Sequence, residues 1–178
     1  MNIIDQIIDN YSNNKSLYIG EKVTMSEHMI QTAMLAEKTN CSSNLVCSSL
    51  LHDYGHFILE NPDQLVTKNK DGRHEDVGCA FLEKYFIEDV LGPIKYHVKA
   101  KKYLAREEKY YRLLSEASRI SLKLQGGIMN DKEAEKFEKN KFFSNSIKLR
   151  KFDEIAKKPG LKIKSIKEYK NLLTSKLI

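Results

Sequence analysis

The chain has 178 residues, of which 41% are hydrophobic and 30% are charged. This length suits one domain, and the apolar share is enough for a core and too high for a disordered chain. No apolar run approaches the roughly 18 residues of a membrane span, and the N-terminus carries acidic residues where a signal peptide carries basic ones. Three cysteines, an odd number without metal-knuckle spacing, indicate reduced thiols. We therefore expect a cytoplasmic protein and exclude secreted, membrane and disulfide-stabilised classes.

The chain is mildly basic, with 30 Lys and Arg against 24 Asp and Glu and a net charge of +6. Most of the excess lies after residue 95. Such a basic half is most often a solvated surface, although nucleic acid or a small anionic substrate also fits it. The sequence has no Trp, no RNA-binding aromatic motif and no Gly-rich phosphate loop. Nothing therefore supports a nucleic-acid or membrane partner, and we expect neither.

In the first part of the chain, apolar residues recur at helical spacing and Ser or Thr residues stand at cap positions. The predicted helices are residues 2–12, a segment from Thr24 or Ser26 to about Lys38, and residues 43–59 after Ser42 or Ser43. The last of these is the most apolar and is expected to be central. Residues 61–73 hold turn formers without periodicity, which predicts a loop, and loops of that length are often functional.

The rest of the chain continues with helices separated by Gly, Pro and capping residues. The predicted helices are residues 73–86, a segment from Pro93 in its first turn towards Glu107, residues 109–125 ended by Gly126 and Gly127, a solvated helix over 131–140, residues 146–158 capped by Ser144 and ended by Pro159 and Gly160, and a last helix begun by the capping box of Ser165 and Glu168. No strand-like alternation of useful length occurs. The sequence therefore predicts an all-α fold, a single helical bundle over residues 1–178.

The chain has only five histidines, which are His28, His52, His56, His74 and His97. His52 and His56 stand four apart, on one face of a predicted helix, and Asp53 adjoins them. Polar side chains buried unpaired in so apolar a helix cost about 1–3 kcal/mol each. A bound metal would remove this cost, because imidazole and carboxylate are good ligands for iron, manganese or zinc. A single helical His is more often a hydrogen-bonded core residue, so only the whole set supports the metal hypothesis.

A His, then a His-Asp pair, then a distal Asp, here His28, His52-Asp53 and Asp153, resembles the HD-domain metalloenzyme superfamily. The further His74 and His97 match its dinuclear branch. The segments that narrow the resemblance are residues 18–21 (YIGE), 27–28 (EH), 97–104 (HVKAKKYL), 117–127 (ASRISLKLQGG) and 150–153 (RKFD). Together they resemble the mixed-valent diiron oxygenases that cleave the carbon–phosphorus bond of 1-hydroxyphosphonates, over about residues 18–160. Inositol oxygenase looks like a more distant relative.

The resemblance implies a site with two iron ions, Fe²⁺ and Fe³⁺. The ligands would be His28, His52 and Asp153 for the first iron, His74 and His97 for the second, and Asp53 as the bridge. Tyr18 would occupy the open position on the second iron until the substrate displaces it, and Glu21 would pair with Tyr18 in that gate. Ligand type alone would equally admit manganese, so iron comes from the resemblance.

The resemblance also places a phosphonate-binding group beside the metals. Lys101 lies four residues after His97, and Arg150 lies three before Asp153, so each shares a helix face with a proposed ligand. The side chains expected to hold the phosphonate dianion are His56, Lys101, Ser118, Ser121 and Arg150. The residues expected to take part in catalysis are Tyr18, Glu21, His56 and Lys101. Gln125 is interpreted only as part of a helix end.

The favoured function is an iron- and O₂-dependent dioxygenase that converts a small anionic 1-hydroxyphosphonate to a carboxylic acid and phosphate. The substituent on carbon 1 stays open among hydroxymethylphosphonate, 2-amino-1-hydroxyethylphosphonate and its trimethylated form, and Glu21 as a partner for an ammonium group favours the amino compound. The alternative is a metal-dependent phosphohydrolase acting on a phosphate ester or nucleotide, with the same ligands around a metal-bound hydroxide. A third hypothesis is a non-catalytic basic binding module. Tyr18 with Glu21, and the 118–121 segment, favour the oxygenase.

Overall fold

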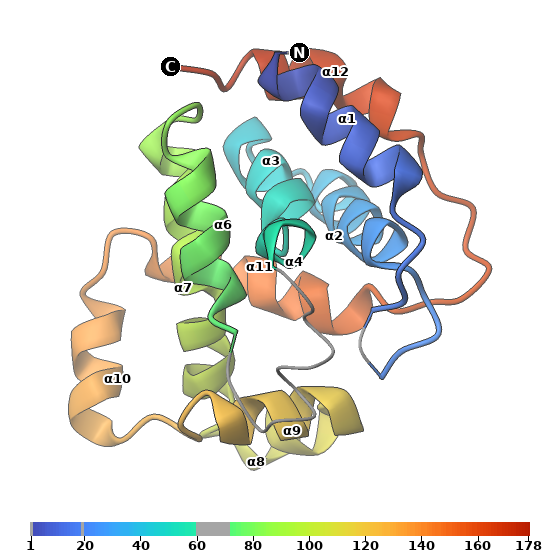
Figure 1. Cartoon of the computed structure of the whole chain (residues 1–178). Coiled ribbons are helices and arrows are strands. Elements are labelled where there is room, and N and C mark those ends of the chain that lie inside the picture. The colour runs from blue at the N-terminus through green and yellow to red at the C-terminus, as the bar shows by residue number, and fades with distance from the viewer. Residues whose placement is uncertain (1, 19, 60–71) are drawn as a thin grey trace.

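The computed structural model describes residues 2–18, 20–59 and 72–178, and its regular structure in these ranges is helical (Figure 1). The elements are α1 (Ile3–Asn13), α2 (Met25–Lys38), α3 (Ser43–Leu51), α4 (Gly55–Ile58), α6 (His74–Leu82), α7 (Glu88–Leu104), α8 (Glu108–Leu113), α9 (Glu116–Leu124), α10 (Asp131–Glu138), α11 (Phe143–Ile155), a 3₁₀ turn (Ile166–Tyr169) and α12 (Lys170–Thr174). The only β pairing among the described residues is two isolated bridges. The all-α prediction is confirmed.

Helices α2, α3, α7 and α11 form the centre of the bundle. α11 packs on α7, α2 and α3, and crosses beneath the last two in Figure 1. Ala33 and Ala36 of α2 are fully buried, and α2 packs on α3. α1 and α12 pack together across one end, where both termini lie, while α8 and α9 lie at the opposite end (Figure 1). The space between the central helices and α9 is where the site is found.

Three predicted helix starts are confirmed by their caps. Thr24, rather than Ser26, caps α2, and Glu27 completes a capping box with it. Ser42, rather than Ser43, caps α3. Ser165 and Glu168 form the predicted capping box, although the turn that follows is 3₁₀ before it becomes α12. Such caps are predictable because donor and acceptor lie within three residues of each other.

The single helix predicted over residues 43–59 is wrong, because α3 ends at Leu51 and α4 begins at Gly55. A Cβ on Gly55 would lie 1.9 Å from the carbonyl oxygen of His74, and one on Gly78 would lie 3.0 Å from the Gly55 nitrogen. The backbones of α4 and α6 therefore touch at two glycines, which redirects the chain after α3. His52 consequently does not share a continuous helix face with His56.

The other boundary errors have local causes. The predicted helix over 109–125 is two helices, since Ser115 caps a new start for α9. Arg73 adopts a left-handed conformation (φ 47°), so α6 starts at His74. Helix α6 ends at Leu82, before the predicted end at Phe86, and Phe86 forms an isolated bridge with Leu177.

Two further helices begin earlier than predicted. The acidic first turn of α7 begins at Glu88, which leaves Pro93 inside the helix rather than in its first turn. α11 begins at Phe143 without a side-chain cap, so Ser144 is inside that helix. Of the predicted loop over 61–73, all but the last two residues lie outside the described ranges.

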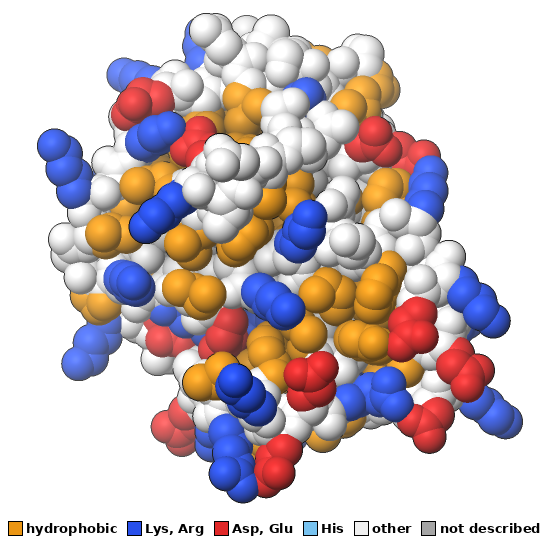
Figure 2. Space-filling model, turned by 180° about the vertical axis from the view of Figure 1, so that it is seen from behind, with side chains coloured by type: hydrophobic (Ala, Val, Ile, Leu, Met, Phe, Trp, Pro, Cys, Tyr) orange, Lys and Arg blue, Asp and Glu red, His pale blue; other side chains and the backbone are white. Residues whose placement is uncertain are grey.

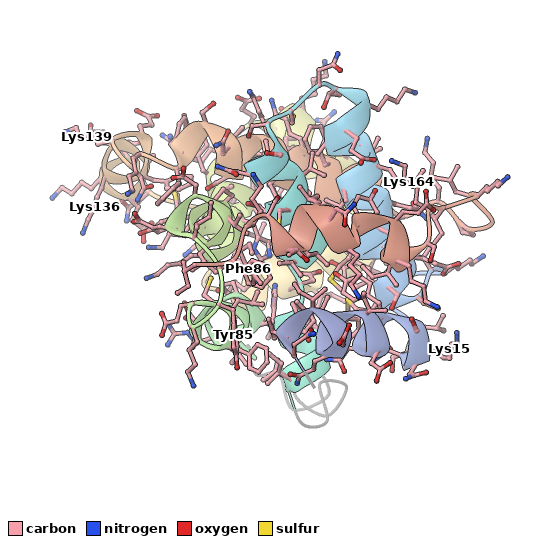
Figure 3. All side chains as sticks on the ribbon, turned by 90° about the horizontal axis from the view of Figure 1, so that it is seen from above. Lys15, Tyr85, Phe86, Lys136, Lys139 and Lys164 are labelled. Atoms are coloured by element: carbon pink, nitrogen blue, oxygen red, sulfur yellow. The ribbon has the colours of Figure 1, made fainter. Side chains whose placement is uncertain are left out.

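The back face of the molecule carries charged side chains of both signs (Figure 2). Figure 2 shows Lys and Arg side chains spread singly over the back face, with acidic side chains between them in its lower part. Lys136 of α10 and Lys139, the residue that follows this helix, point away from the body of the molecule (Figure 3), as expected of a solvated segment. No helix in the described ranges is long and apolar enough to cross a membrane.

Candidate metal centre

Six donor side chains from five parts of the fold meet between the central helices. They are His28 of α2, His52 and Asp53 of the turn after α3, His74 at the start of α6, His97 of α7 and Asp153 of α11. All except His74, which is 13% exposed, are no more than 2% exposed. They fall into two sets, His28 with His52 and Asp153, and Asp53 with His74 and His97, and the donor atoms within each set lie within 4.8 Å of one another.

Asp53 lies between the two sets and turns one carboxylate oxygen to each. Its Oδ2 lies 3.5 Å from His28 Nε2 and 3.3 Å from His52 Nε2. Its Oδ1 lies 3.2 Å from His74 Nε2 and 3.4 Å from His97 Nε2. This is the arrangement that a carboxylate bridging two cations requires, and the interrupted helix produces it, because Asp53 stands in the turn between α3 and α4.

The histidine tautomers are fixed by backbone carbonyls. The Nδ1 atoms of His28, His52 and His97 donate to the carbonyl oxygens of Ala156, Ser49 and Ile94, at 2.8, 2.9 and 2.6 Å respectively. A carbonyl can only accept, so in the neutral ring each Nε2 carries a lone pair that faces the cluster. His74 differs, since its Nδ1 lies 3.7 Å from the carboxylate of Glu75.

The short distances between histidine Nε2 atoms test whether a cation fits this cluster. The Nε2 atoms of His28 and His52 are 3.2 Å apart, and those of His74 and His97 are 3.1 Å apart. Two ring nitrogens at this separation, beside carboxylates, need a positive charge among them, which either a ring proton or a bound cation supplies. The residues therefore fit one divalent cation in each set, and a donor group of imidazole and carboxylate without thiolate suits iron, manganese or zinc.

The local field also favours positive charge. Burial raises the pKa of Asp53, but His52 and His74 outweigh it and hold that pKa well below its usual value. For Asp153, burial is likewise outweighed, chiefly by Arg150. Burial lowers the pKa of His28, yet hydrogen bonds to Asp153 and Asp53 raise it to about 9. Both carboxylates are thus ionised at neutral pH, and their field attracts a cation.

A cavity of about 250 Å³ opens beside the second set. Asp53, His74 and His97 all line it, whereas from the first set only Asp153 does. The remaining wall comes mainly from α9 and from Lys101 of α7. A small molecule in this cavity would therefore meet the second set directly.

Four of the residues expected to hold a phosphonate line this cavity together. Lys101 is 4% exposed and donates to Ser121 Oγ at 2.8 Å, and Ser118 stands one turn before Ser121. Burial, helped by Arg150, lowers the pKa of Lys101 to about 7. The His56 ring stacks on His74 with 4.3 Å between centroids, and its buried Nδ1 has no hydrogen-bond partner among the described residues. Burial, with His74, lowers the pKa of His56 to about 3, so this ring is neutral.

Arg150 also lines the cavity, but its donors are engaged by the protein. Its Nε donates to Tyr110 Oη at 2.9 Å, its Nη1 to Asp153 and its Nη2 to Glu154. The side chain is only 3% exposed. Arg150 therefore holds Asp153 in place, which differs from the free phosphonate anchor expected from the sequence.

Tyr18 and Glu21 also differ from the expected gate. The Tyr18 ring stacks on His28, 4.0 Å between centroids and 9° between planes, so it covers a member of the first set rather than the second. Burial, with Asp53 and Asp153, raises the pKa of Tyr18 well above its usual value. Glu21 Oε1 lies 3.2 Å from Lys157 Nζ, so the ion-pair partner of Glu21 is Lys157 and not the Tyr18 side chain.

Sequence reasoning missed three residues at the site. Lys157 and Gln125 line the cavity, and Glu154 contacts both Arg150 and Lys157. The available signal was spacing, because Glu154 follows Arg150 by four residues and precedes Lys157 by three. In a basic stretch this pattern is indistinguishable from a solvated face.

Comparison with known proteins places the chain in a family. The HD domain family matches residues 25–124, which includes every donor except Asp153. The chain is 41% identical over 145 residues to the [1-hydroxy-2-(trimethylamino)ethyl]phosphonate dioxygenase (glycine-betaine-forming) of Leisingera caerulea, covering 81% of this chain and 74% of that protein. It is 40% identical over 154 residues to the hydroxymethylphosphonate dioxygenase of Gimesia maris, covering 85% and 77%. An uncharacterized protein of Acanthamoeba polyphaga mimivirus, L432, is 37% identical over 183 residues, covering 97% and 84%.

The chain therefore belongs to the HD-domain family, and its clustered His and Asp side chains form a site of the metal-binding kind. Within that family it belongs with the phosphonate dioxygenases that these relatives represent. The resemblance inferred from the motifs is confirmed, and the oxygenase class is supported over the phosphohydrolase alternative.

Proposed function

We propose that the protein is an iron-dependent dioxygenase that cleaves the carbon–phosphorus bond of a small 1-hydroxyphosphonate. The observation that carries the proposal is the second donor set, which borders a cavity walled by Lys101, Ser118 and Ser121. Two of the similar proteins are named as dioxygenases of compounds of this class. The reaction would consume one dioxygen molecule for each carboxylic acid and each phosphate that it forms.

Two iron ions would be held by the six donors, with Asp53 between them. His28, His52 and Asp153 would hold the first, and His74 and His97 the second. The iron pair would supply the activation of dioxygen that no side chain can perform. The carbonyls behind His28, His52 and His97 keep the Nε2 lone pairs directed inward, which orients these ligands before any metal arrives.

The phosphonate dianion would lie against Lys101 and the two serines. A compact dianion binds best to charge-assisted donors in a site from which water is largely excluded. Lys101 has two ammonium protons beyond the one it gives to Ser121, and the anion would stabilise its charged form against burial. The His56 ring, which stacks on His74 and is neutral, would add a hydrogen-bond donor without adding charge.

The carbon-1 substituent would lie along the apolar part of the wall. Val98, Ile120 and Leu124 line the cavity together with the carboxylate-bearing Glu116. A short carbon chain suits such a wall, and a carboxylate at its edge favours a cationic substituent. Of the candidates, 2-amino-1-hydroxyethylphosphonate and its trimethylated form carry such a charge and are the first to test, and hydroxymethylphosphonate, which has no substituent, is the second.

The test is phosphate release in air and under argon. Iron-loaded protein would be incubated with 2-amino-1-hydroxyethylphosphonate, with hydroxymethylphosphonate and with the trimethylated compound, and p-nitrophenyl phosphate would serve as the ester control. We expect release from at least one phosphonate in air, none from the ester, and no more than one turnover under argon. Steady release under argon would overturn the oxygenase proposal.

A further inference from the structure

The α1–α2 loop brings Tyr18 and Gly20 to the wall of the cavity, and Glu21 follows them in the chain. In its described residues, Tyr18 N donates to Val23 O at 2.8 Å and Glu21 N to Tyr18 O at 2.8 Å, and these bonds define a tight turn. Gly20 adopts a φ of +76°, and a Cβ there would lie 2.8 Å from Ala117 Cβ of α9. The tip of the loop thus rests on α9, one wall of the cavity.

Lys157 stands where this loop, α9 and α11 meet. Its Nζ lies 3.1 Å from Ser115 Oγ, 3.0 Å from Ser118 Oγ and 3.3 Å from Glu154 Oε1. An ammonium group has three protons, and these three acceptors account for them. Lys157 follows Ala156, whose carbonyl fixes His28, so the ammonium group stands on a segment tied to the donor cluster.

The same ammonium group contacts both side chains of the loop. Glu21 Oε1 lies 3.2 Å away but receives no hydrogen bond of good geometry from the described residues, so the attraction is electrostatic. The Tyr18 ring lies 5.7 Å from Lys157 Nζ, within the range of a cation–π contact. Lys157 Nζ thus lies 3.2 Å from a carboxylate oxygen of Glu21 and 3.3 Å from one of Glu154, so its charge offsets the repulsion between these two carboxylates.

We propose that Lys157 is the positioning residue for the α1–α2 loop: its charge holds Glu21 in place, keeps Tyr18 against the cavity and so sets how tightly the site closes on a substrate. This inference rests on the proposed function for its effect on catalysis, but not for its effect on the loop. Lys157 would act through Glu21 and Tyr18, and it would ligate no metal.

The test is amide hydrogen exchange of iron-loaded, substrate-free protein, read by mass spectrometry on the peptide covering residues 14–24. Lys157→Met keeps the length and apolar stem of the side chain and removes its charge. We expect exchange in this peptide to accelerate about tenfold, the change for a lost contact to a charged group, with unchanged exchange in α2 and α7 and unchanged iron content. Lys158→Met, one residue on and exposed, is the matched control and should leave the loop at the parent's rate.

Each other outcome decides the proposal as well. Faster exchange confined to α9, with the 14–24 peptide unchanged, would mean that Lys157 only ties Ser115 and Ser118 to α11, and would overturn the inference. If amide exchange in Lys157→Met is fast throughout the protein, the same measurement is made on Glu21→Gln. This variant removes the charge of the loop residue that pairs with Lys157. Loop exchange at the parent's rate in Glu21→Gln would then overturn it.

Kinetics separate this proposal from the proposed function. With an accepted phosphonate, Lys157→Met should raise KM about tenfold more than it lowers kcat, and Lys157→Arg should restore most of the loss. If no phosphonate is turned over by the parent, the proposed function fails while the exchange experiment still judges Lys157.

Discussion

The two donor sets use the same ligand types in different surroundings. His28 and His52 are fully buried and do not border the cavity, and the Tyr18 ring covers His28. His74 is 13% exposed and His97 borders the cavity beside it. Under the proposed function, the first set would hold a metal that keeps its ligands, and the second would hold one that exchanges a ligand for substrate. Two metals held by the same types of donor would therefore differ in role because substrate reaches only one of them.

The partners of the two sets follow the same division. Arg150 and the carbonyl of Ala156 fix Asp153 and His28 in the first set. Lys101 and the two serines face the cavity next to the second. A residue that supports the first set should thus affect metal binding, and one that faces the cavity should affect substrate binding with the metals retained.

The largest effect is expected from Asp53→Ala, because Asp53 serves both sets. Iron should fall from about two ions per chain to nearly none, since each set loses a carboxylate oxygen and the repulsion between the two cations is no longer offset. Iron analysis after anaerobic loading and desalting measures this. Asp9→Ala, at an exposed position of α1, is the control. Retention of both ions in Asp53→Ala would remove the dinuclear arrangement from consideration.

Arg150→Ala tests the supporting side of the comparison. Since Arg150 donates to Asp153 and Glu154, its loss should free Asp153 and weaken iron in the first set about ten- to hundredfold, as for other residues behind a metal ligand. A competition titration with a chelator gives the two iron affinities. Lys148→Ala, exposed on the same helix, should change neither. If Arg150→Ala binds both irons like the parent and loses only phosphonate affinity, Arg150 belongs to the substrate side, as the sequence first indicated.

Lys101→Ala tests the cavity side. Both irons should remain, while phosphonate affinity falls about ten- to hundredfold, because a charge-assisted contact is lost. Calorimetric titration under argon measures the affinity without turnover. The control is Lys99→Ala, which removes an exposed lysine of the same helix. Parent-like binding by Lys101→Ala would mean that its bond to Ser121 is only structural.

The sequence predicted the helices well wherever the signal was local. Thr24 and Ser165 mark helix starts because a cap and its donor lie within one turn. The break after Leu51 was missed because its cause is tertiary: Gly55 touches the backbone of α6 at His74 and Gly78, which lie 19 and 23 residues further along the chain. Pattern reasoning sees a continuous apolar run there and extends the helix.

The site was predicted unevenly for a similar reason. The six donors could be found because histidines are few and match a family register, and the structure brings all six together. The roles of Arg150 and Lys157 could not be predicted, since each depends on which carboxylate lies near that side chain in the folded protein. Arg150 meets Glu154, and Lys157 meets Glu21 from another segment. Charge spacing along one helix does not distinguish a buried network from a solvated face.

The smallest effect that we expect is a pH dependence of phosphonate affinity, which arises from Lys101 in the cavity. Burial and Arg150 lower the pKa of Lys101 to about 7, so above this pH the substrate-free protein holds Lys101 mostly neutral. A bound phosphonate favours the charged form, so binding above pH 7 must take up a proton, and affinity should fall by up to about tenfold per pH unit there. Below pH 7 Lys101 is already charged, and this contribution is constant.

Proton uptake isolates Lys101 from the ionisation of the substrate. Calorimetric titrations at pH 8 under argon, in two buffers of different ionisation enthalpy, give the protons taken up on binding. The substrate's own ionisation is common to every variant, so the difference between parent and Lys101→Arg, whose guanidinium stays charged, belongs to Lys101. We expect the parent to take up nearly one proton more than Lys101→Arg at pH 8 and about the same number at pH 6. If the parent and Lys101→Arg take up the same number of protons at both pH values, Lys101 is charged before the substrate arrives. The cavity would then be a preformed cationic site.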